Sequence, residues 1–307
     1  MLSGAGELME DFTKGAAWMR GRIMPIADAG ISVLDWGLTR SDITYDVVHA
    51  WEGSFFRLDD YLDRFEASVN SLRLDIGQNR ESIRKILNDV VAATGLKSAY
   101  VSMVASRGTP SIPGTRDPRL CDNHFYAWAV PFVWVIKPEV AKRGAHIMVA
   151  STSRRISPEA VDPRVKNYHW GDMTRALFES LDAGFDTCVL LDEQDHVTEG
   201  PGFNVFAVTD GEVITPRSGM LEGITRKTVI EICSELGYPC EARDINVSEF
   251  LDADEIFTAT TAGGPVPVTK TNTRILGNGK IGPISEAIMK TYWDWHKQDK
   301  YLTPIDY

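Results

Sequence analysis

The sequence predicts a two-domain α+β fold, with a small α/β N-terminal domain followed by a larger, β-rich domain. Residues 1–133 combine two segments of helical periodicity with runs of strand-forming residues, and past Pro138 the pattern changes to short strands separated by turn residues. At 307 residues and 43% hydrophobic content, the chain can bury a substantial core. We expect the domains at 1–133 and 142–307, with a linker at 134–141.

The N-terminal domain is expected to contain hairpins and two helices. The stretch AAWMRGRIMPIAD predicts one hairpin, and ITYDVVHAWEGSFFRL predicts another that turns at Glu52-Gly53. Apolar residues at helical spacing predict amphipathic helices over 57–72 and 81–94, the second ending at Gly95. Two strand-forming segments, AYVSMVASRG and HFYAWAVPFVWVI, flank a long proline-rich loop, TPSIPGTRDPRLCDN, of a kind that is often functional.

The second domain is expected to combine short strands with four helices. Its predicted strands are HIMVAST, TCVLLDE, HVTEG, FNVFAVTDG, EVITP and EIFTAT. Its predicted helices cover 171–183, 225–236, 247–251 and 284–295.

The charge balance excludes several classes of partner. The formal net charge is -11 at pH 7, whereas nucleic acid or an anionic membrane would attract a basic surface. No apolar run approaches the roughly 20 residues of a membrane span, and the opening MLSGAGELMEDF lacks the features of a signal peptide. We expect a cytoplasmic protein that acts on small molecules.

Cysteine and histidine spacings predict no metal site. Cys121, Cys188, Cys233 and Cys240 match no zinc, redox or disulfide framework, and the six histidines form no pattern such as HExxH. We interpret the cysteines as buried thiols.

Lys166 has unusual neighbours for a lysine. In DPRVKNYHWGD it lies between Val165 and the aromatic residues Tyr168 and Trp170. Desolvation disfavours the charged ammonium form, so such neighbours suit a lysine that reacts as a free amine. The alternative is a surface lysine whose alkyl stem covers apolar neighbours, and the local sequence leaves both open.

Two segments of the second domain could hold an anion. In LEGITRKTVIEI, Gly223, Ile224 and Thr225 begin a predicted helix, where free backbone N–H groups and the helix dipole favour phosphate. In ATTAGG, the hydroxyls of Thr260 and Thr261 stand beside two glycines that let backbone amides approach a ligand. A helix cap and a tight turn explain these segments without any ligand.

Two charged residues acquire a role only if a cofactor is present. Arg64, on the helix predicted over 57–72, could complete a phosphate site or form a surface ion pair. Glu199 ends a short apolar strand beside Gly200-Pro201-Gly202, where it could pair with a protonated heteroaromatic nitrogen or lie in a solvated turn.

Five ordered motifs resemble those of the fold-type IV pyridoxal-phosphate enzymes. They are RLDDYLDRFEAS, VKNYHW, EGPGFN, EGITR and TTAGG, and the resemblance extends from about Gly15 to Tyr307. This group contains branched-chain and D-amino acid aminotransferases, aminodeoxychorismate lyases and (R)-selective amine transaminases. The resemblance implies a D-amino acid aminotransferase-like fold with a pseudo-barrel C-terminal domain, a pyridoxal 5'-phosphate cofactor and at least a homodimer.

The resemblance also implies roles for individual residues. Lys166 would bind the cofactor covalently and shuttle the substrate proton, and Glu199 would pair with the pyridine nitrogen. The phosphate-binding cup would comprise Arg64, Ile224, Thr225 and Thr261, with Thr260 beside them.

The substrate-side motifs resemble the (R)-selective amine transaminases. Asn167 and Tyr168 follow Lys166 directly, whereas branched-chain enzymes carry a longer segment there. TRSDITYDVVHAWEG and AYVSMVASRG match the pocket-lining segments of the subgroup, although its members place histidine at the position of Arg40. The residues that would contact the substrate are Arg40, Tyr45, Val47, Tyr100, Ser102, Arg116 and Trp170.

We therefore expect a transaminase that moves an amino group from an (R)-configured primary amine to a keto acid such as pyruvate, in two half-reactions. Val47 and Tyr100 suit a bulky uncharged group, and Arg116 on the predicted loop could bind the keto acid carboxylate when needed. Two alternatives stay open. One is a D-amino acid or branched-chain aminotransferase with Arg40 or Arg116 as a permanent carboxylate ligand, and the other is a non-catalytic binding protein.

Overall fold

We describe a computed structural model of the chain, which covers residues 11–272 and 274–307. Most of the opening stretch MLSGAGELMEDF lies outside the described residues, so the expectation about a signal peptide stays a prediction. Within the described part, no helix is long and apolar enough to cross a membrane.

The chain divides into two compact units. The first is formed by the segment ending at Leu58, by 72–132 and by 303–307, and the second is formed by 59–71 and 133–302. This division departs from the predicted bounds in that 59–71 groups with the second unit and 303–307 with the first. The residues predicted as a linker, 134–141, all belong to the second unit.

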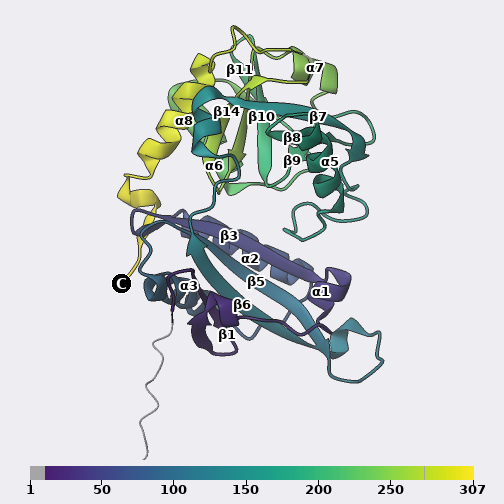
Figure 1. Cartoon of the computed structure of the whole chain (residues 1–307), viewed down its shortest axis with the longest axis vertical. Coiled ribbons are helices and arrows are strands. Elements are labelled where there is room, and N and C mark those ends of the chain that lie inside the picture. Colours follow the sequence, from purple (N-terminus) through teal and green to yellow (C-terminus); the bar gives the residue numbers. More distant parts are fainter. Residues whose placement is uncertain (1–10, 273) are drawn as a thin grey trace, which may run out of the picture. The chain divides into compact units, whose positions relative to one another are not determined.

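A seven-stranded sheet forms the first unit, in the order β15-β4-β3-β5-β6-β1-β2 (Figure 1). Both predicted hairpins are confirmed, and the second turns at Glu52 and Gly53, which adopt φ values of 50° and 88°. Helix α3 (Arg80–Thr94) packs against β1, β5 and β6, and it ends as predicted at Gly95 in the left-handed region. The strands are β1 Ala16–Met19, β2 Arg22–Pro25, β3 Ile43–Trp51, β4 Ser54–Phe56, β5 Ala99–Pro110, β6 Cys121–Pro131 and β15 Leu302–Pro304.

The long loop predicted over 109–123 is present over 111–120, and the residues at its two ends belong to strands. Strand β5 runs to Pro110, β6 begins at Cys121, and a short 3-10 helix covers Pro118–Leu120. The ladder passes a register shift between Ser106 and Thr109. At that shift Gly108 has a φ of 75°, and a Cβ there would lie 1.8 Å from the carbonyl oxygen of Asp122. The glycine thus permits a bulge that lets pairing continue into proline-rich sequence.

The second unit contains an eight-stranded sheet in the order β12-β11-β10-β13-β14-β7-β8, with β9 paired to β10. Parallel pairs β7–β8, β7–β14 and β11–β12 flank an antiparallel centre. Its core gathers aliphatic and aromatic residues such as Val205, Ile214, Phe250 and Ile256. The strands are β7 Ala145–Arg154, β8 Thr187–Leu191, β9 Glu199–Gly200, β10 Phe203–Thr209, β11 Glu212–Thr215, β12 Cys240–Ala242, β13 Glu255–Thr260 and β14 Gly264–Lys270.

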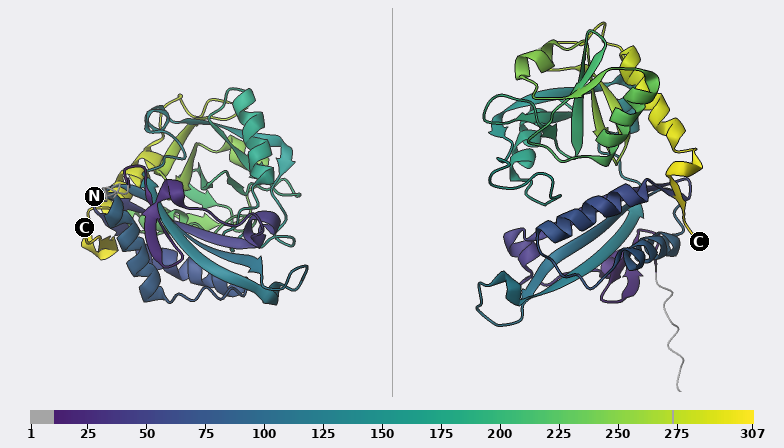
Figure 2. Two further views of the ribbon diagram at one scale, coloured as in Figure 1. Left: turned by 60° about the horizontal axis from the view of Figure 1, so that its bottom comes forward. Right: turned by 180° about the vertical axis from the view of Figure 1, so that it is seen from behind.

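Helices pack against this sheet at several positions (Figure 2). Helix α5 packs against β7 and β8, α6 against β12 and β13, and α8 against β13 and β14. All four helices predicted for the second domain are present, and α4 was not predicted. The helices are α2 Leu58–Ser71, α4 Pro138–Arg143, α5 Gly171–Asp182, α6 Ile224–Leu236, α7 Val247–Asp252 and α8 Pro283–Trp295.

Candidate active site

Strand pairing fixes Glu199 in the short strand β9, which lies off the main strand order of the second sheet and pairs with β10. In β9, Glu199 pairs with Asn204 of β10, and Asn204 pairs in turn with Ala259 of β13. The neighbouring Gly200 is closely packed, because a Cβ there would lie 2.4 Å from the carbonyl oxygen of Cys188. Across β10, Glu199 therefore lies level with the residue that precedes Thr260, the last residue of β13.

The Glu199 carboxylate is buried and bonded at both oxygens. Its residue is 5% exposed, Oε1 accepts from Arg155 Nε at 3.0 Å, and Oε2 accepts from the Leu221 N–H at 3.0 Å. Burial raises the pKa of Glu199, opposed by the charge of Arg155, the Leu221 N–H and the charge of Lys166. Glu199 is therefore not a solvated turn residue, and an additional cation would favour its ionised form.

Arg155 is a site residue that the sequence analysis missed. It is 7% exposed, and besides Glu199 it bonds Asp172, whose Oδ2 accepts from Arg155 Nη1 at 2.6 Å. The same oxygen accepts from the Ile156 N–H at 2.8 Å. Arg155 follows directly after β7, and nothing in the stretch TSRRIS distinguishes it from its exposed neighbour Arg154.

Lys166 lies in the connection between β7 and α5, and its side chain is partly exposed. The preceding Val165 is buried, and the Asn167 side chain braces the turn by donating to the Val165 carbonyl oxygen and accepting from the His169 N–H. The positive charge of Lys166 acts on Glu199, so the two groups belong to one electrostatic environment. Trp170, half-buried, stands before the first residue of α5.

The start of α6 carries uncapped backbone donors. Gly223 precedes the helix and no side chain caps it. A Cβ at Gly223 would lie 2.0 Å from Asn204 Oδ1, and Asn204 Nδ2 donates to the Leu221 carbonyl oxygen at 2.8 Å. Asn204 and Glu199 thus both hold the turn that leads into α6, and they place its N-terminus beside the buried carboxylate.

Thr225 carries a buried hydroxyl that the described residues leave unsatisfied. Thr225 is 3% exposed, and its Oγ1 has no hydrogen-bond partner among them, whereas the hydroxyl of Thr228 donates to the Ile224 carbonyl oxygen. Burying an unpaired hydroxyl costs about 1–3 kcal/mol. An unpaired hydroxyl beside uncapped helix N–H groups fits the oxygens of a bound phosphate.

The other residues predicted for the cup lie around this helix start. Arg64 Nη1 of α2 donates to the Glu222 carbonyl oxygen at 3.0 Å, and Tyr61 Oη lies 2.8 Å from Thr261 Oγ1. Thr260 differs, because its hydroxyl donates at 2.8 Å to the carbonyl oxygen of Gly202, which lies 58 residues earlier in the sequence. A cleft of about 700 Å³ is lined in part by Arg64, Val165, Gly223 and Ile224.

The first unit presents the predicted pocket residues on one face of its sheet. Val47 pairs with Ser102, and Tyr45 and Tyr100 lie two residues away from this pair on their own strands, so all four side chains share a face. Tyr100 stacks on Trp128 with ring centroids 5.6 Å apart, and burial raises the pKa of Tyr100. These four residues carry no formal charge, and they give the face an apolar and aromatic character.

Two arginines of the first unit have contrasting surroundings. Arg40, on α1 (Trp36–Arg40), places its Cζ 3.4 Å from the ring centroid of Trp36. Arg116 is exposed and forms no hydrogen bond or ion pair with any other described residue. Asp117 bonds Arg119 instead, so pairing of Arg116 with Asp117 is not found.

Comparison with known proteins places this arrangement in a family. The sequence profile of amino-transferase class IV matches residues 44–271. The chain belongs to this family. The match covers the strands of the aromatic face as well as Lys166, Glu199 and the start of α6.

Individual members of the family align along almost the whole chain. A branched-chain-amino-acid aminotransferase of Pseudomonas aeruginosa is 27% identical over 285 residues, covering 91% of this chain and 92% of its own. The crystal structure of a branched-chain aminotransferase from Thermoproteus uzoniensis with norvaline is 30% identical, with a TM-score of 0.85 over 95% of this chain and 99% of its own. The PLP-form of the Thermobaculum terrenum enzyme is 25% identical, with a TM-score of 0.84 over 97% and 100%.

Proposed function

We propose that this aminotransferase moves the amino group of an (R)-configured primary amine to a keto acid such as pyruvate. That it is an aminotransferase with the fold of the class IV family follows from the match over 44–271 and from the structural neighbours. The donor is the proposed part, and the single observation that carries it is the uncharged aromatic face around Val47 and Tyr100.

The cofactor is pyridoxal 5'-phosphate. The unpaired Thr225 hydroxyl and the uncapped N-terminus of α6 suit its phosphate, with Arg64 able to add a full positive charge. Glu199, already buried, suits its ring nitrogen. When bound, the cofactor supplies an electron-accepting ring that stabilises negative charge at the substrate α-carbon.

The chain's own residues supply binding and proton transfer. Lys166 would hold the cofactor through its Nζ, and the same amine would take the proton from the substrate α-carbon. Glu199 keeps a proton on the ring nitrogen, and Arg155 and the Leu221 N–H hold its carboxylate in place. Arg64, Thr225 and Thr261 orient the cofactor through its phosphate, and Thr260 supports the turn that carries Thr261.

Substrate selection is proposed to depend on the first unit. Tyr45, Val47 and Tyr100 would accept an uncharged substituent, and Ser102 supports the strand pair by donating to the Asp46 carbonyl oxygen at 3.3 Å. A keto acid needs a cation for its carboxylate, and Arg116, which is exposed and has no partner among the described residues, can provide one when it is required. Trp170 would add a further aromatic contact.

A branched-chain or D-amino acid aminotransferase is the second candidate, and the names of the relatives favour the branched-chain form. An apolar pocket accepts a branched aliphatic side chain as readily as an aryl group, and Arg40 or Arg116 would then bind the carboxylate of every substrate. We also propose at least a homodimer, which the exposed Phe178 and Leu181 of α5 support as a contact surface.

Spectrophotometric half-reactions separate the candidates. The purified enzyme with bound cofactor is mixed separately with the two enantiomers of 1-phenylethylamine, with D-alanine, with L-leucine and with L-glutamate. In each case, loss of the absorbance band of the lysine-bound cofactor is followed. The proposal expects reaction with (R)-1-phenylethylamine and none with its enantiomer. Reaction with L-leucine or D-alanine but not with 1-phenylethylamine would replace the proposal by the second candidate.

A further inference from the structure

We propose that two polar anchors set the position of α1, and that through α1 they preset Arg40 to bind the substrate carboxylate. This inference rests on the expectation that Arg40 contacts the substrate, and it goes beyond the proposed function, in which Arg116 is the cation for the keto acid carboxylate. The first anchor is Asp35, at the start of α1. The second is the pair formed by Asp42 and Arg107, just beyond its end.

Asp35 ties the start of α1 to two strands. It is 1% exposed, and its Oδ1 accepts from the Gly37 N–H at 2.7 Å and from Ser106 Oγ at 2.6 Å. Its Oδ2 lies 2.6 Å from His124 Nε2. Because Ser106 belongs to β5 and His124 to β6, one carboxylate both caps the helix and fastens it to the sheet.

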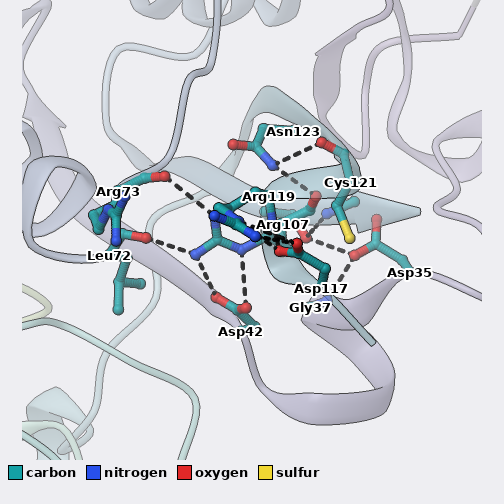
Figure 3. Close-up of polar contacts among 12 residues, drawn as sticks. Asp35, Gly37, Asp42, Leu72, Arg73, Arg107, Asp117, Arg119, Cys121 and Asn123 are labelled. Atoms are coloured by element: carbon teal, nitrogen blue, oxygen red, sulfur yellow. Dashed lines mark hydrogen bonds and ion pairs between the residues drawn. The ribbon is translucent and has the colours of Figure 1, made fainter. Parts of the chain in front are cut away.

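Gly37 allows this close approach of helix to strand. A Cβ at Gly37 would lie 2.3 Å from Ser106 Oγ and 3.0 Å from Asp35 Oδ1. Any larger residue would push α1 away from β5 or break the Asp35 contacts. Gly37 and Asp35 are both drawn in Figure 3.

The second anchor holds the end of α1 (Figure 3). The helix ends at Ser41, in the left-handed region, and Asp42 follows. Asp42 accepts from Arg107 Nε at 2.9 Å and from Arg107 Nη2 at 3.2 Å, and its carbonyl oxygen accepts from the Arg107 N–H. Arg107 is 8% exposed and also donates to the carbonyl oxygens of Leu72 and Arg73, so its guanidinium is fully engaged.

Ser106 and Arg107, which are consecutive residues of β5, thus form hydrogen bonds at the two ends of the five-residue helix α1. A helix this short has little stability of its own, so its position depends on these anchors. Its one charged residue is Arg40, whose guanidinium lies against the buried ring of Trp36. A cation held in this way loses less conformational freedom when it binds an anion, which raises affinity.

Arg40 and Arg116 would accordingly contribute in different ways. Arg116 has no partner among the described residues and must be ordered when it binds. Arg40 is held before the substrate arrives. The anchors are therefore positioning residues that act through Arg40, and their loss should raise the KM of substrates that carry a carboxylate.

The test compares pyruvate and (R)-1-phenylethylamine as substrates of variants of the full enzyme with bound cofactor. Arg40→Ala should raise the KM for pyruvate roughly tenfold to a hundredfold, the range expected when a charged hydrogen-bond donor is lost. Asp35→Ala should raise it by a smaller factor, and Asp35→Asn, which keeps a capping oxygen, should restore part of the affinity. The KM for the amine should stay within about twofold, because the amine carries no carboxylate for Arg40 to bind.

Asn79→Ala is the matched control. Asn79 caps α3 in the same unit by accepting from the Ser82 N–H at 2.9 Å, and among the described residues it forms no hydrogen bond with α1. Its loss should lower the melting temperature without changing the KM for pyruvate. If Asp35→Ala does not fold, Asp42→Asn, at a more exposed carboxylate, tests the second anchor in the same way.

A double-mutant cycle decides whether the anchors act through Arg40. Adding Asp35→Ala to Arg40→Ala should not raise the KM for pyruvate any further. The inference would be overturned by a further increase of the KM for pyruvate in the double variant, or by equal changes of the KM for pyruvate and the KM for the amine. The same change of the KM for pyruvate in Asn79→Ala would also overturn it. Failure of the proposed donor would appear separately, as no reaction of the unmodified enzyme with (R)-1-phenylethylamine.

Discussion

Replacing Glu199 by glutamine tests the role of the buried carboxylate at nearly constant volume. The glutamine keeps one acceptor oxygen, but its amide NH₂ must face either Arg155 Nε or the Leu221 N–H, both of which are donors at 3.0 Å. A hydrogen bond to a charged group contributes about 1.5–3 kcal/mol. If the ring nitrogen loses such a bond in the transition state, the amine half-reaction should slow roughly tenfold to a hundredfold, at 1.36 kcal/mol per tenfold change.

The assay is the rate constant of the amine half-reaction, followed by the absorbance of the lysine-bound cofactor under single-turnover conditions. Glu255→Gln is the matched control, because Glu255 is also buried and accepts from the N–H groups of Ile284 and Ser285, at the start of α8. The control should lose stability and keep its rate constant. An unchanged rate constant in Glu199→Gln, with cofactor bound, would refute the assignment of Glu199 to the ring nitrogen.

Three further predictions concern other parts of the site. Thr225→Ala should weaken cofactor binding by about 1 kcal/mol, or roughly fivefold. It should not destabilise the cofactor-free protein, because the hydroxyl that it removes has no hydrogen-bond partner among the described residues. A lower melting temperature with unchanged cofactor affinity would contradict this prediction. Arg116→Ala should lower the affinity for pyruvate and D-alanine roughly tenfold to a hundredfold and leave the affinity for (R)-1-phenylethylamine nearly unchanged. Equal losses of affinity for all three substrates would mean that Arg116 only orders its loop. No loss of affinity would leave binding of the carboxylate to Arg40. Burial opposes the ionisation of Asp35, but hydrogen bonds from His124, Ser106 and the Gly37 N–H outweigh it and lower its pKa. The ionised carboxylate therefore contributes to stability above about pH 4, and this contribution is lost as the pH falls further. In urea unfolding, the stability difference between the wild type and Asp35→Asn should shrink between pH 7 and pH 3, and a constant difference would contradict the prediction.

Local sequence patterns predicted several of the structural elements around the candidate site. The helix start at Ile224 was marked by Gly223, and the end of α3 by Gly95, because both signals depend on residues within one helical turn. Glu199 was singled out by its place at the end of an apolar strand. The uncapped N–H groups of α6 follow from Gly223 itself, which has no side chain with which to cap them.

Contacts between distant residues could not be predicted in this way. Arg155 reaches Glu199 across 44 residues of sequence, and Ser106 reaches Asp35 across 71. Neither residue type nor spacing distinguishes such an arginine or serine from others nearby. The loop predicted over 109–123 was too long for a related reason: a bulge at Gly108 lets the β5–β6 ladder continue past residues that locally favour turns.

The most direct test of the account is to find which lysine holds the cofactor. The enzyme purified with pyridoxal 5'-phosphate is reduced with borohydride, digested and analysed by mass spectrometry, with Lys166→Ala treated in parallel. The account predicts one phosphopyridoxyl-modified peptide, carrying the label on Lys166, and neither label nor cofactor absorbance band in the variant. Label on another lysine of the wild type, or an unchanged absorbance band and activity in Lys166→Ala, would contradict it.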